Sequence, residues 1–178
     1  MTISVRRFEA DEWRVYRELR LGALRDAPDA FGSTYEREAA RPEADWEQRL
    51  AAAVTARGEM PIVALSGATP VGLAWGRVDE REPTVAHLFQ VWVAPEHRAR
   101  GIGRSLTDAV IAWARELGVR ALRLDVTPSH PAALRLYRRA GFVEHGRPAA
   151  LRPGSSVLSQ PLQLVLQGDI EHPSARER

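Results

Sequence analysis

The chain has 178 residues, of which 44% are hydrophobic, enough to bury one core and too few to divide comfortably between two. It contains no cysteine, which excludes disulfides, thiolate metal sites and a cysteine acyl-enzyme, and all 25 of its basic residues are arginine, which excludes a Walker-type phosphate loop and a lysine Schiff base. The net charge of +2 argues only weakly for nucleic acid, and because we find neither an apolar stretch of roughly 20 residues nor a secretory signal, we expect a cytoplasmic protein.

The N-terminal part of the chain predicts one strand and two helices. Residues 3–8 alternate between apolar and polar side chains, as a half-buried strand does. Asp11 can cap a helix that runs to about Asp26, and a second helix is predicted within residues 41–58. The segment between the two helices predicts a loop.

The middle of the chain predicts an antiparallel meander followed by a helix. Three strand-like runs, residues 61–67, 70–79 and 84–93, are separated by short turn-forming segments that suit hairpins. Apolar residues then recur at helical spacing from Ile102 until Gly118, where the helix is expected to end.

The C-terminal part returns to alternation. Residues 120–126 predict a strand, and a helix follows from Pro131 to the glycine at position 141. Residues 142–147 and 157–167 close the sequence as strands, the second one bent or at a sheet edge because it contains a proline.

The predicted order of elements is β-α-α-β-β-β-α-β-α-β-β. We assign it to one domain, residues 1–168, and expect residues 169–178 to form a flexible tail. A mixed α/β sheet with helices on both faces is the simplest architecture that buries these apolar patterns.

A glycine-containing turn, residues 94–106 (APEHRARGIGRSL), connects the meander to the following helix. Gly101 and Gly103 let backbone N–H groups approach a ligand, and a helix N-terminus binds anions through its free N–H groups and dipole. A dinucleotide fingerprint needs a third glycine where this chain has Leu106, so the diphosphate of another ligand fits the turn better. The alternative is an ordinary tight turn with solvated arginines.

Two segments of the chain resemble the cofactor-binding motifs of the GNAT superfamily of N-acetyltransferases. The family's acetyl-CoA signature is a basic or amide residue, two variable residues, glycine, one variable residue, and then glycine or alanine. Arg98, Gly101 and Gly103 match it in this order. Residues 124–146 resemble the family's second segment, and the matching residues there are Leu136, Tyr137, Gly141 and Phe142. The predicted order of elements is also the family's order.

The resemblance implies a mostly antiparallel sheet whose fourth and fifth strands splay apart to admit the pantetheine arm of acetyl-CoA. Backbone groups of the fourth strand would bind the pantetheine amides and polarise the thioester carbonyl, and the glycine turn would bind the pyrophosphate. The cofactor-binding residues implied are Val91, Trp92, Val93, Arg98, Arg100, Gly101, Ile102, Gly103, Arg104, Ser105, His130 and Tyr137. His130 departs from the family, which usually carries asparagine there, and no metal is implied.

The resemblance also implies direct transfer of the acetyl group from acetyl-CoA to a primary amine, and the absence of cysteine agrees with this route. Tyr137 matches the family's tyrosine beside the thioester sulfur and is the candidate general acid. The general base stays open among several side chains, which are His87, Gln90, Asp125, Glu36, Glu38 and Glu96.

The acceptor site is expected at the first two helices, the loop between them and the last strands. Its candidate residues are Phe31, Tyr35, Trp75 and Gln90, with Trp46 as a further aromatic wall, although ordinary core positions are the alternative for the aromatic residues. We expect a small-molecule amine in preference to a peptide, no nucleic-acid or membrane partner, and a homodimer through the final strands. The remaining alternative is a protein of the same fold that senses acyl-CoA without turnover.

Overall fold

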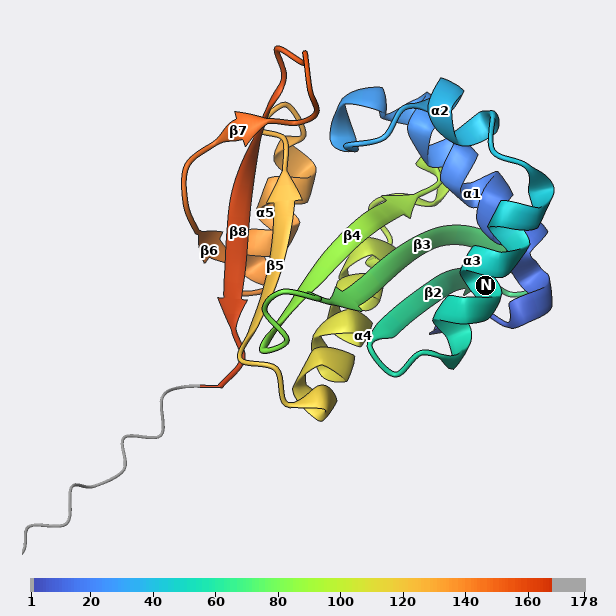
Figure 1. Ribbon diagram of the computed structural model, residues 1–178, viewed down its shortest axis with the longest axis horizontal. Coiled ribbons are helices and arrows are strands. Elements are labelled where there is room, and N and C mark those ends of the chain that lie inside the picture. The colour runs from blue at the N-terminus through green and yellow to red at the C-terminus, as the bar shows by residue number, and fades with distance from the viewer. Residues whose placement is uncertain (1, 168–178) are drawn as a thin grey trace, which may run out of the picture.

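A mixed sheet runs through the centre of the computed structural model, which describes residues 2–167 (Figure 1). Within these residues the strand order is β1-β2-β3-β4-β5-β8-β6, and β7 also pairs with β8. The strands are β1 (Ile3–Arg7), β2 (Glu59–Ser66), β3 (Thr69–Val78), β4 (Val85–Val93), β5 (Ala121–Val126), β6 (Val143–Glu144), β7 (Ala149–Ala150) and β8 (Leu158–Val165). The β4–β5 pair is parallel and the other pairs are antiparallel, which confirms the predicted mixed, mostly antiparallel sheet.

The predicted helices are present, together with one that the sequence analysis missed. The α-helices are α1 (Trp13–Asp26), α2 (Tyr35–Ala39), α3 (Glu43–Thr55), α4 (Ile102–Leu117) and α5 (Pro131–Arg139). The unpredicted helix, α2, has only five residues, too few for a periodic pattern to show. Its N-terminus is capped by Thr34, whose side chain accepts a hydrogen bond from the Arg37 N–H at 3.3 Å.

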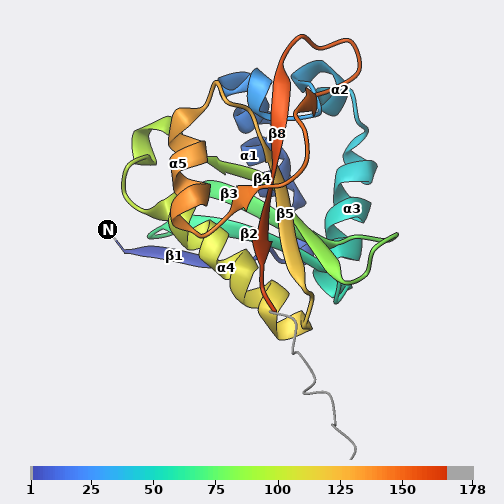
Figure 2. The ribbon, with the colours of Figure 1, turned by 90° about the vertical axis from the view of Figure 1, so that its left-hand side faces the viewer.

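The helices cover both faces of the sheet, because each has an apolar stripe that packs on strand residues. Figure 2 shows α4 and α5 on one side of the sheet and α3 on the other. On the α4 side the buried cluster includes Ile102, Leu106, Val110, Ala86 and Leu122, and on the other side it includes Tyr16, Trp46, Leu50, Val63 and Trp75. None of the helices within residues 2–167 is long and apolar enough to cross a membrane.

The strands β4 and β5 pair only at their starts. Their register is Val85↔Ala121, Ala86↔Leu122 and His87↔Arg123, and beyond this point the two strands diverge, as Figure 1 shows. Just after the last pair, β4 contains a bulge, where the β3–β4 register shifts and Gln90 adopts a φ of 57°. The expected splay between the fourth and fifth strands is therefore confirmed, and the bulge lies at its mouth.

The C-terminal strands differ from the prediction in two respects. The strand predicted over residues 142–147 is reduced to the two residues of β6, and β7 is a separate pair of residues. The strand that contains Pro161 is not at the edge, because β8 lies between β5 and β6. Pro161 lies beyond the β6 pairing, which ends at Leu162, and its carbonyl accepts a hydrogen bond from the His145 N–H at 2.9 Å. The predicted tail, residues 169–178, lies outside the described residues.

Candidate active site

A groove of about 1870 Å³ lies between the diverging ends of β4 and β5. It continues along the glycine turn and the start of α4 on one side, and to α1 and the loop before α2 on the other. The predicted site residues that line it are Phe31, Gln90, Val91, Trp92, Val93, Arg98, Gly101, Ile102, Gly103, Arg104, His130 and Tyr137. One continuous groove thus brings together most of the predicted cofactor residues and part of the predicted acceptor site.

The glycine turn presents backbone N–H groups at one edge of this groove. Gly101 has a φ of 80°, a left-handed conformation that favours glycine, and it caps the N-terminus of α4. Ser105 was expected to bind the cofactor, but its N–H donates to the Gly101 carbonyl at 3.0 Å, so the free donors of the helix N-terminus end before it. At Gly103 an added Cβ would lie 3.2 Å from Leu136 Cδ1, so the helix and α5 pack closely here. The free N–H groups and the helix dipole suit an anion.

The three arginines of the turn differ in their contacts. Arg98 donates from Nε to the Val93 carbonyl at 2.9 Å and forms an ion pair with Asp26. Arg104 pairs with Asp108 at 2.7 Å on the exposed face of α4. Arg100 is exposed and does not line the groove. Of the three side chains, Arg98 and Arg104 are therefore placed to add positive charge to the groove.

Tyr137 lies on α5 with its ring buried and only 8% of the residue exposed, and it lines the groove. Its ring packs edge-on against Phe142, with the centroids 5.9 Å apart. Burial raises the pKa of the phenol above its ordinary value, because the ionised form loses hydration. The hydroxyl therefore stays protonated at neutral pH and can donate a proton or a hydrogen bond into the groove.

Two buried polar atoms without partners lie where β5 gives way to α5. His130 Nε2 and Thr127 Oγ1 have no hydrogen-bond partner among the described residues, and both residues line the groove. The backbone fixes them in place, since the His130 N–H donates to the Thr127 carbonyl at 3.0 Å. Because buried polar groups normally have partners, these two atoms fit a polar ligand in the groove, and His130 can supply the hydrogen bond expected of the usual asparagine.

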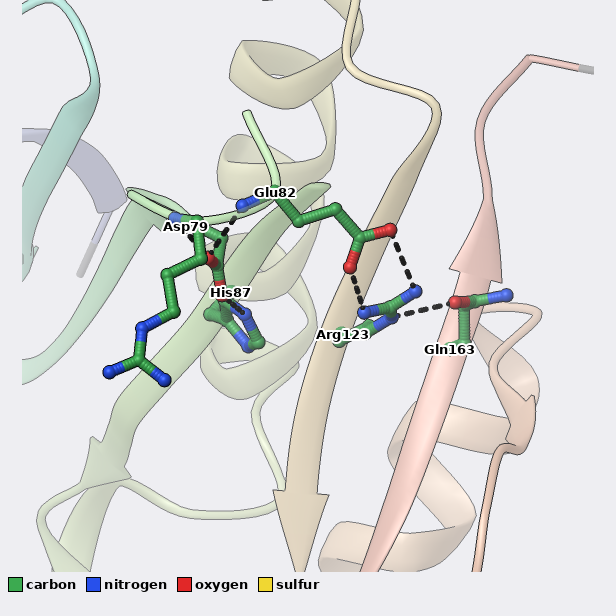
Figure 3. Close-up of polar contacts among 6 residues, drawn as sticks. Asp79, Glu82, His87, Arg123 and Gln163 are labelled. Atoms are coloured by element: carbon green, nitrogen blue, oxygen red, sulfur yellow. Dashed lines mark hydrogen bonds and ion pairs between the residues drawn. The ribbon is translucent and has the colours of Figure 1, made fainter. Parts of the chain in front are cut away.

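His87 lines the groove on the first half of β4, and a carboxylate holds its imidazole. Asp79 Oδ2 lies 2.9 Å from His87 Nε2, while Asp79 Oδ1 accepts the backbone N–H groups of Arg81 at 2.7 Å and Glu82 at 2.9 Å (Figure 3). These backbone hydrogen bonds, and then His87 itself, lower the pKa of Asp79 to about 2. The imidazole therefore faces an ionised carboxylate at all ordinary pH values, which fixes its orientation.

Gln90 lies in the β4 bulge and is buried at the groove. Its side-chain oxygen accepts a hydrogen bond from the Tyr16 hydroxyl at 3.1 Å, so this amide is held by α1. An amide cannot take up a proton at neutral pH, and Gln90 is therefore not a candidate base.

The far end of the groove, beside α1 and α2, is lined by Phe31 together with Arg20, Glu38 and Arg49. Glu38 is only 4% exposed and accepts hydrogen bonds from Ser33 at 2.7 Å and Arg41 at 2.9 Å. Its pKa is lowered because these hydrogen bonds and the neighbouring arginines outweigh the effect of burial. Glu38 is therefore ionised, and both of its carboxylate oxygens already have partners within the protein.

Three of the aromatic residues expected at the acceptor site do not line this groove. Trp75 and Trp46 are 0% exposed and belong to the core between α1, α3 and the sheet. The Trp75 indole N–H donates to Glu59, which satisfies it away from the groove. Tyr35 lines a separate cavity of about 310 Å³ with Glu36, and its hydroxyl accepts from Arg25. Of the expected aromatic walls, only Phe31 is at the groove.

The structure also separates the candidate bases. Glu96 is exposed outside the groove, and Glu36 lies at the smaller cavity. Asp125 lines the groove at the end of β5 but is exposed. His87 alone of these candidates lines the groove with a carboxylate partner for its basic group.

Several residues of the groove were missed in the sequence analysis, among them Asp79 and Arg20. Asp79 closes the β3–β4 hairpin, and no local pattern indicates that it faces His87. A signal for Arg20 was present, because Tyr16, Leu19 and Ala23 form the buried stripe of α1 and position 20 falls within it. A charged residue in an apolar stripe deserves a functional explanation.

The comparisons with known proteins agree with this geometry. The family model described as "Acetyltransferase (GNAT) family" matches residues 20–142. A mycothiol acetyltransferase from Geodermatophilus obscurus is 34% identical over 87 residues, which are 47% of this chain and 28% of that protein. The chain thus spans well under half of the length of the curated relatives that it matches.

Solved structures share the fold at low sequence identity. An acetyltransferase of the GNAT family from Streptococcus pneumoniae superposes with a TM-score of 0.79 and 19% identity, over 93% of this chain and 100% of that one. A putative acetyltransferase from Salmonella typhimurium, solved with its cofactor acetyl-CoA, gives a TM-score of 0.78 at 18% identity, over 94% of this chain and 96% of that one.

Proposed function

Since the chain belongs to the GNAT family of acetyltransferases, we propose that it transfers the acetyl group of acetyl-CoA directly to a primary amine, a small molecule in preference to a protein. The observation that carries this proposal is the groove between β4 and β5, which joins the glycine turn, Tyr137 and His87 in one space. A reaction between two bound substrates needs such a continuous space.

The donor end of the groove suits coenzyme A. The pyrophosphate would take the free N–H groups at the start of α4, with Arg98 and Arg104 adding charge. The unpaired His130 Nε2 and Thr127 Oγ1 offer further polar contacts to the same molecule. Because β4 pairs with β5 only as far as His87, the later residues of β4 have no partner strand on that side, and their backbone groups can bind an extended arm, with the Val93 carbonyl already taken by Arg98.

His87 is the proposed general base. A primary amine is an ammonium ion at neutral pH and must lose a proton before it attacks the thioester carbon. The imidazole is the side chain that ordinarily titrates near neutral pH, and Asp79 stabilises the imidazolium that forms. The proton passes to His87 directly or through one water.

Tyr137 is the proposed general acid. As the new C–N bond forms and the C–S bond breaks, the leaving thiolate must gain a proton. The Tyr137 hydroxyl is protonated and lines the groove, and its buried ring is fixed against Phe142. The nitrogen loses two protons between ammonium and amide: His87 takes the first before attack, and water takes the second from the tetrahedral intermediate. The sulfur gains one proton from Tyr137, which is then reprotonated from solvent.

The experiment that tests the proposal is a thiol-release assay with acetyl-CoA and a panel of amines and peptides, paired with calorimetry of coenzyme A binding. Turnover with any small amine supports the proposal. Tight coenzyme binding without turnover by any acceptor would favour the acyl-CoA sensor instead, and no coenzyme binding would reject both.

A further inference from the structure

Arg20 is a buried arginine with an incomplete set of partners. It is 4% exposed, and its Nε and Nη1 atoms have no hydrogen-bond partner among the described residues. Burial lowers the pKa of this guanidinium from its ordinary value, but arginine remains charged in proteins. Because an uncompensated buried charge is costly, its presence at the groove calls for a ligand of opposite charge.

The neighbouring carboxylate, Glu38, attracts Arg20 but is shared with two other arginines. Glu38 accepts a hydrogen bond from the Ser33 hydroxyl at 2.7 Å and forms ion pairs with Arg41 at 2.9 Å and Arg49 at 3.9 Å. Three arginines therefore surround a single carboxylate, which leaves an excess of positive charge at this end of the groove. A purely structural cluster of buried charges would be expected to balance.

The flat face of the Arg20 guanidinium is held by an aromatic ring. Its guanidinium carbon lies 4.7 Å from the centre of the Phe31 ring, and both residues line the groove. Stacking on an aromatic face leaves the edge of the guanidinium free to make two parallel hydrogen bonds to an oxyanion.

The position of Arg20 relative to the reaction is set by α1. Tyr16, one helical turn earlier, donates to Gln90 in the β4 bulge at 3.1 Å. Side chains four residues apart on a helix lie on the same face, so Arg20 follows Tyr16 on the face of α1 that meets the bulge. Arg20 and Gln90 line the same groove, so one small acceptor can contact both.

We infer that the acceptor of the proposed reaction is a small amine that also carries a carboxylate or a phosphonate, and that Arg20 binds this oxyanion with Arg49 beside it. The inference rests on the proposed function and adds the substrate class to it. Phe31 would cover the apolar part of such a molecule.

The test compares matched acceptors in the thiol-release assay with acetyl-CoA. The panel contains the common L-amino acids, their carboxamides, and the corresponding 1-aminoalkylphosphonic acids. We expect acetylation of at least one amino acid or aminophosphonate, and a lower kcat/KM for its neutral amide. The carboxylate and phosphonate arms distinguish the two kinds of oxyanion.

The variant Arg20→Met should lower kcat/KM for the anionic acceptor by roughly 10- to 150-fold, the value of a hydrogen bond to a charged group, and should change it little for the amide. It should also leave the melting temperature of the free protein unchanged or raised, because a buried charge without a full partner is replaced by an apolar side chain. Arg14→Met is the matched control, since Arg14 is exposed on the same helix, stacks on Trp13 and does not line the groove.

Calorimetry separates failure of this inference from failure of the proposed function. Turnover of neutral amines with equal or higher efficiency than the anionic ones would overturn the inference and leave the function standing. If no amine turns over, the function fails, and binding of the amino acids and aminophosphonates to the protein with coenzyme A still tests the oxyanion site. Loss of stability in Arg20→Met with unchanged acceptor preference would make Arg20 a structural residue.

Discussion

Arg98, the arginine of the cofactor signature, forms an ion pair with Asp26 at the end of α1. The same carboxylate accepts a hydrogen bond from the Trp92 indole N–H at 2.8 Å. Asp26 thus ties the end of β4 and the glycine turn to α1. A diphosphate bound at the turn, as proposed, would compete with Asp26 for Arg98, and the protein's own carboxylate would then oppose coenzyme binding.

The substitution Asp26→Asn should therefore tighten coenzyme A binding. The amide can still accept the Trp92 N–H, whereas it no longer neutralises Arg98 or repels the diphosphate. Calorimetry at low and high salt measures the effect, which should shrink as salt screens the charges. Asp11→Asn, an exposed carboxylate that does not line the groove, serves as the control. Equal or weaker coenzyme binding in Asp26→Asn would contradict the competition.

Gly101→Ala should weaken coenzyme A binding and also destabilise the fold. Its φ of 80° costs an alanine about 1–2 kcal/mol, although an added Cβ meets nothing within 4 Å. Gly67, at the β2–β3 turn, has a φ of 62° and equally open space, and so offers a matched control away from the groove. We expect both alanine variants to lower the melting temperature similarly and only Gly101→Ala to reduce coenzyme affinity. Equal coenzyme affinities in the two variants would remove the turn from the binding site.

Tyr137→Phe should reduce kcat by about 100-fold or more, with little change in coenzyme affinity. The phenylalanine keeps the buried ring and its contact with Phe142, so only the hydroxyl is lost. Single-turnover kinetics and calorimetry on the same preparation measure the two effects. An unchanged kcat when acetyl transfer limits the rate would exclude Tyr137 as the general acid.

The sequence predicted the elements whose side chains repeat most regularly. The stripe of α4 and the alternation of β5 were sufficient, because each element buries one face against the same core. The glycine turn was also predictable, because glycine adopts a positive φ such as that of Gly101 more readily than other residues, and the glycine is visible in the sequence. The bulge had no such signal, because its positive φ falls on Gln90.

The acceptor side of the groove was less predictable, for a physical reason. Phe31 and Trp75 are both large aromatic residues, and the sequence does not say which of them faces the core. The contact between Asp79 and His87 depends on how the β3–β4 hairpin closes, which composition does not record. Arg20 was visible as a charge in an apolar stripe, although its unpaired atoms could be found only in the structure.

The last prediction concerns the pH dependence of the reaction. The pKa of Asp79 is lowered to about 2 from an ordinary value of 3.8. The ionised carboxylate therefore stabilises the folded protein above pH 3.8, and this contribution to folding stability is lost only as the pH falls through about 2. Asp79 therefore stays ionised throughout any practical activity assay. A fall of kcat/KM on the acid side of neutral pH would therefore report protonation of a group other than Asp79.

His87→Gln should lower kcat/KM by about 100-fold or more at neutral pH. Asp79→Asn should also lower kcat/KM, because the amide no longer places a negative charge beside the imidazole. Glu82→Gln is the control, because the Glu82 side chain pairs with Arg123 at 2.7 Å and does not contact His87 (Figure 3). The backbone N–H at position 82 still donates a hydrogen bond to Asp79 in this variant. An unchanged kcat/KM in His87→Gln would transfer the role of base to another group of the groove, with Asp125 the next to test.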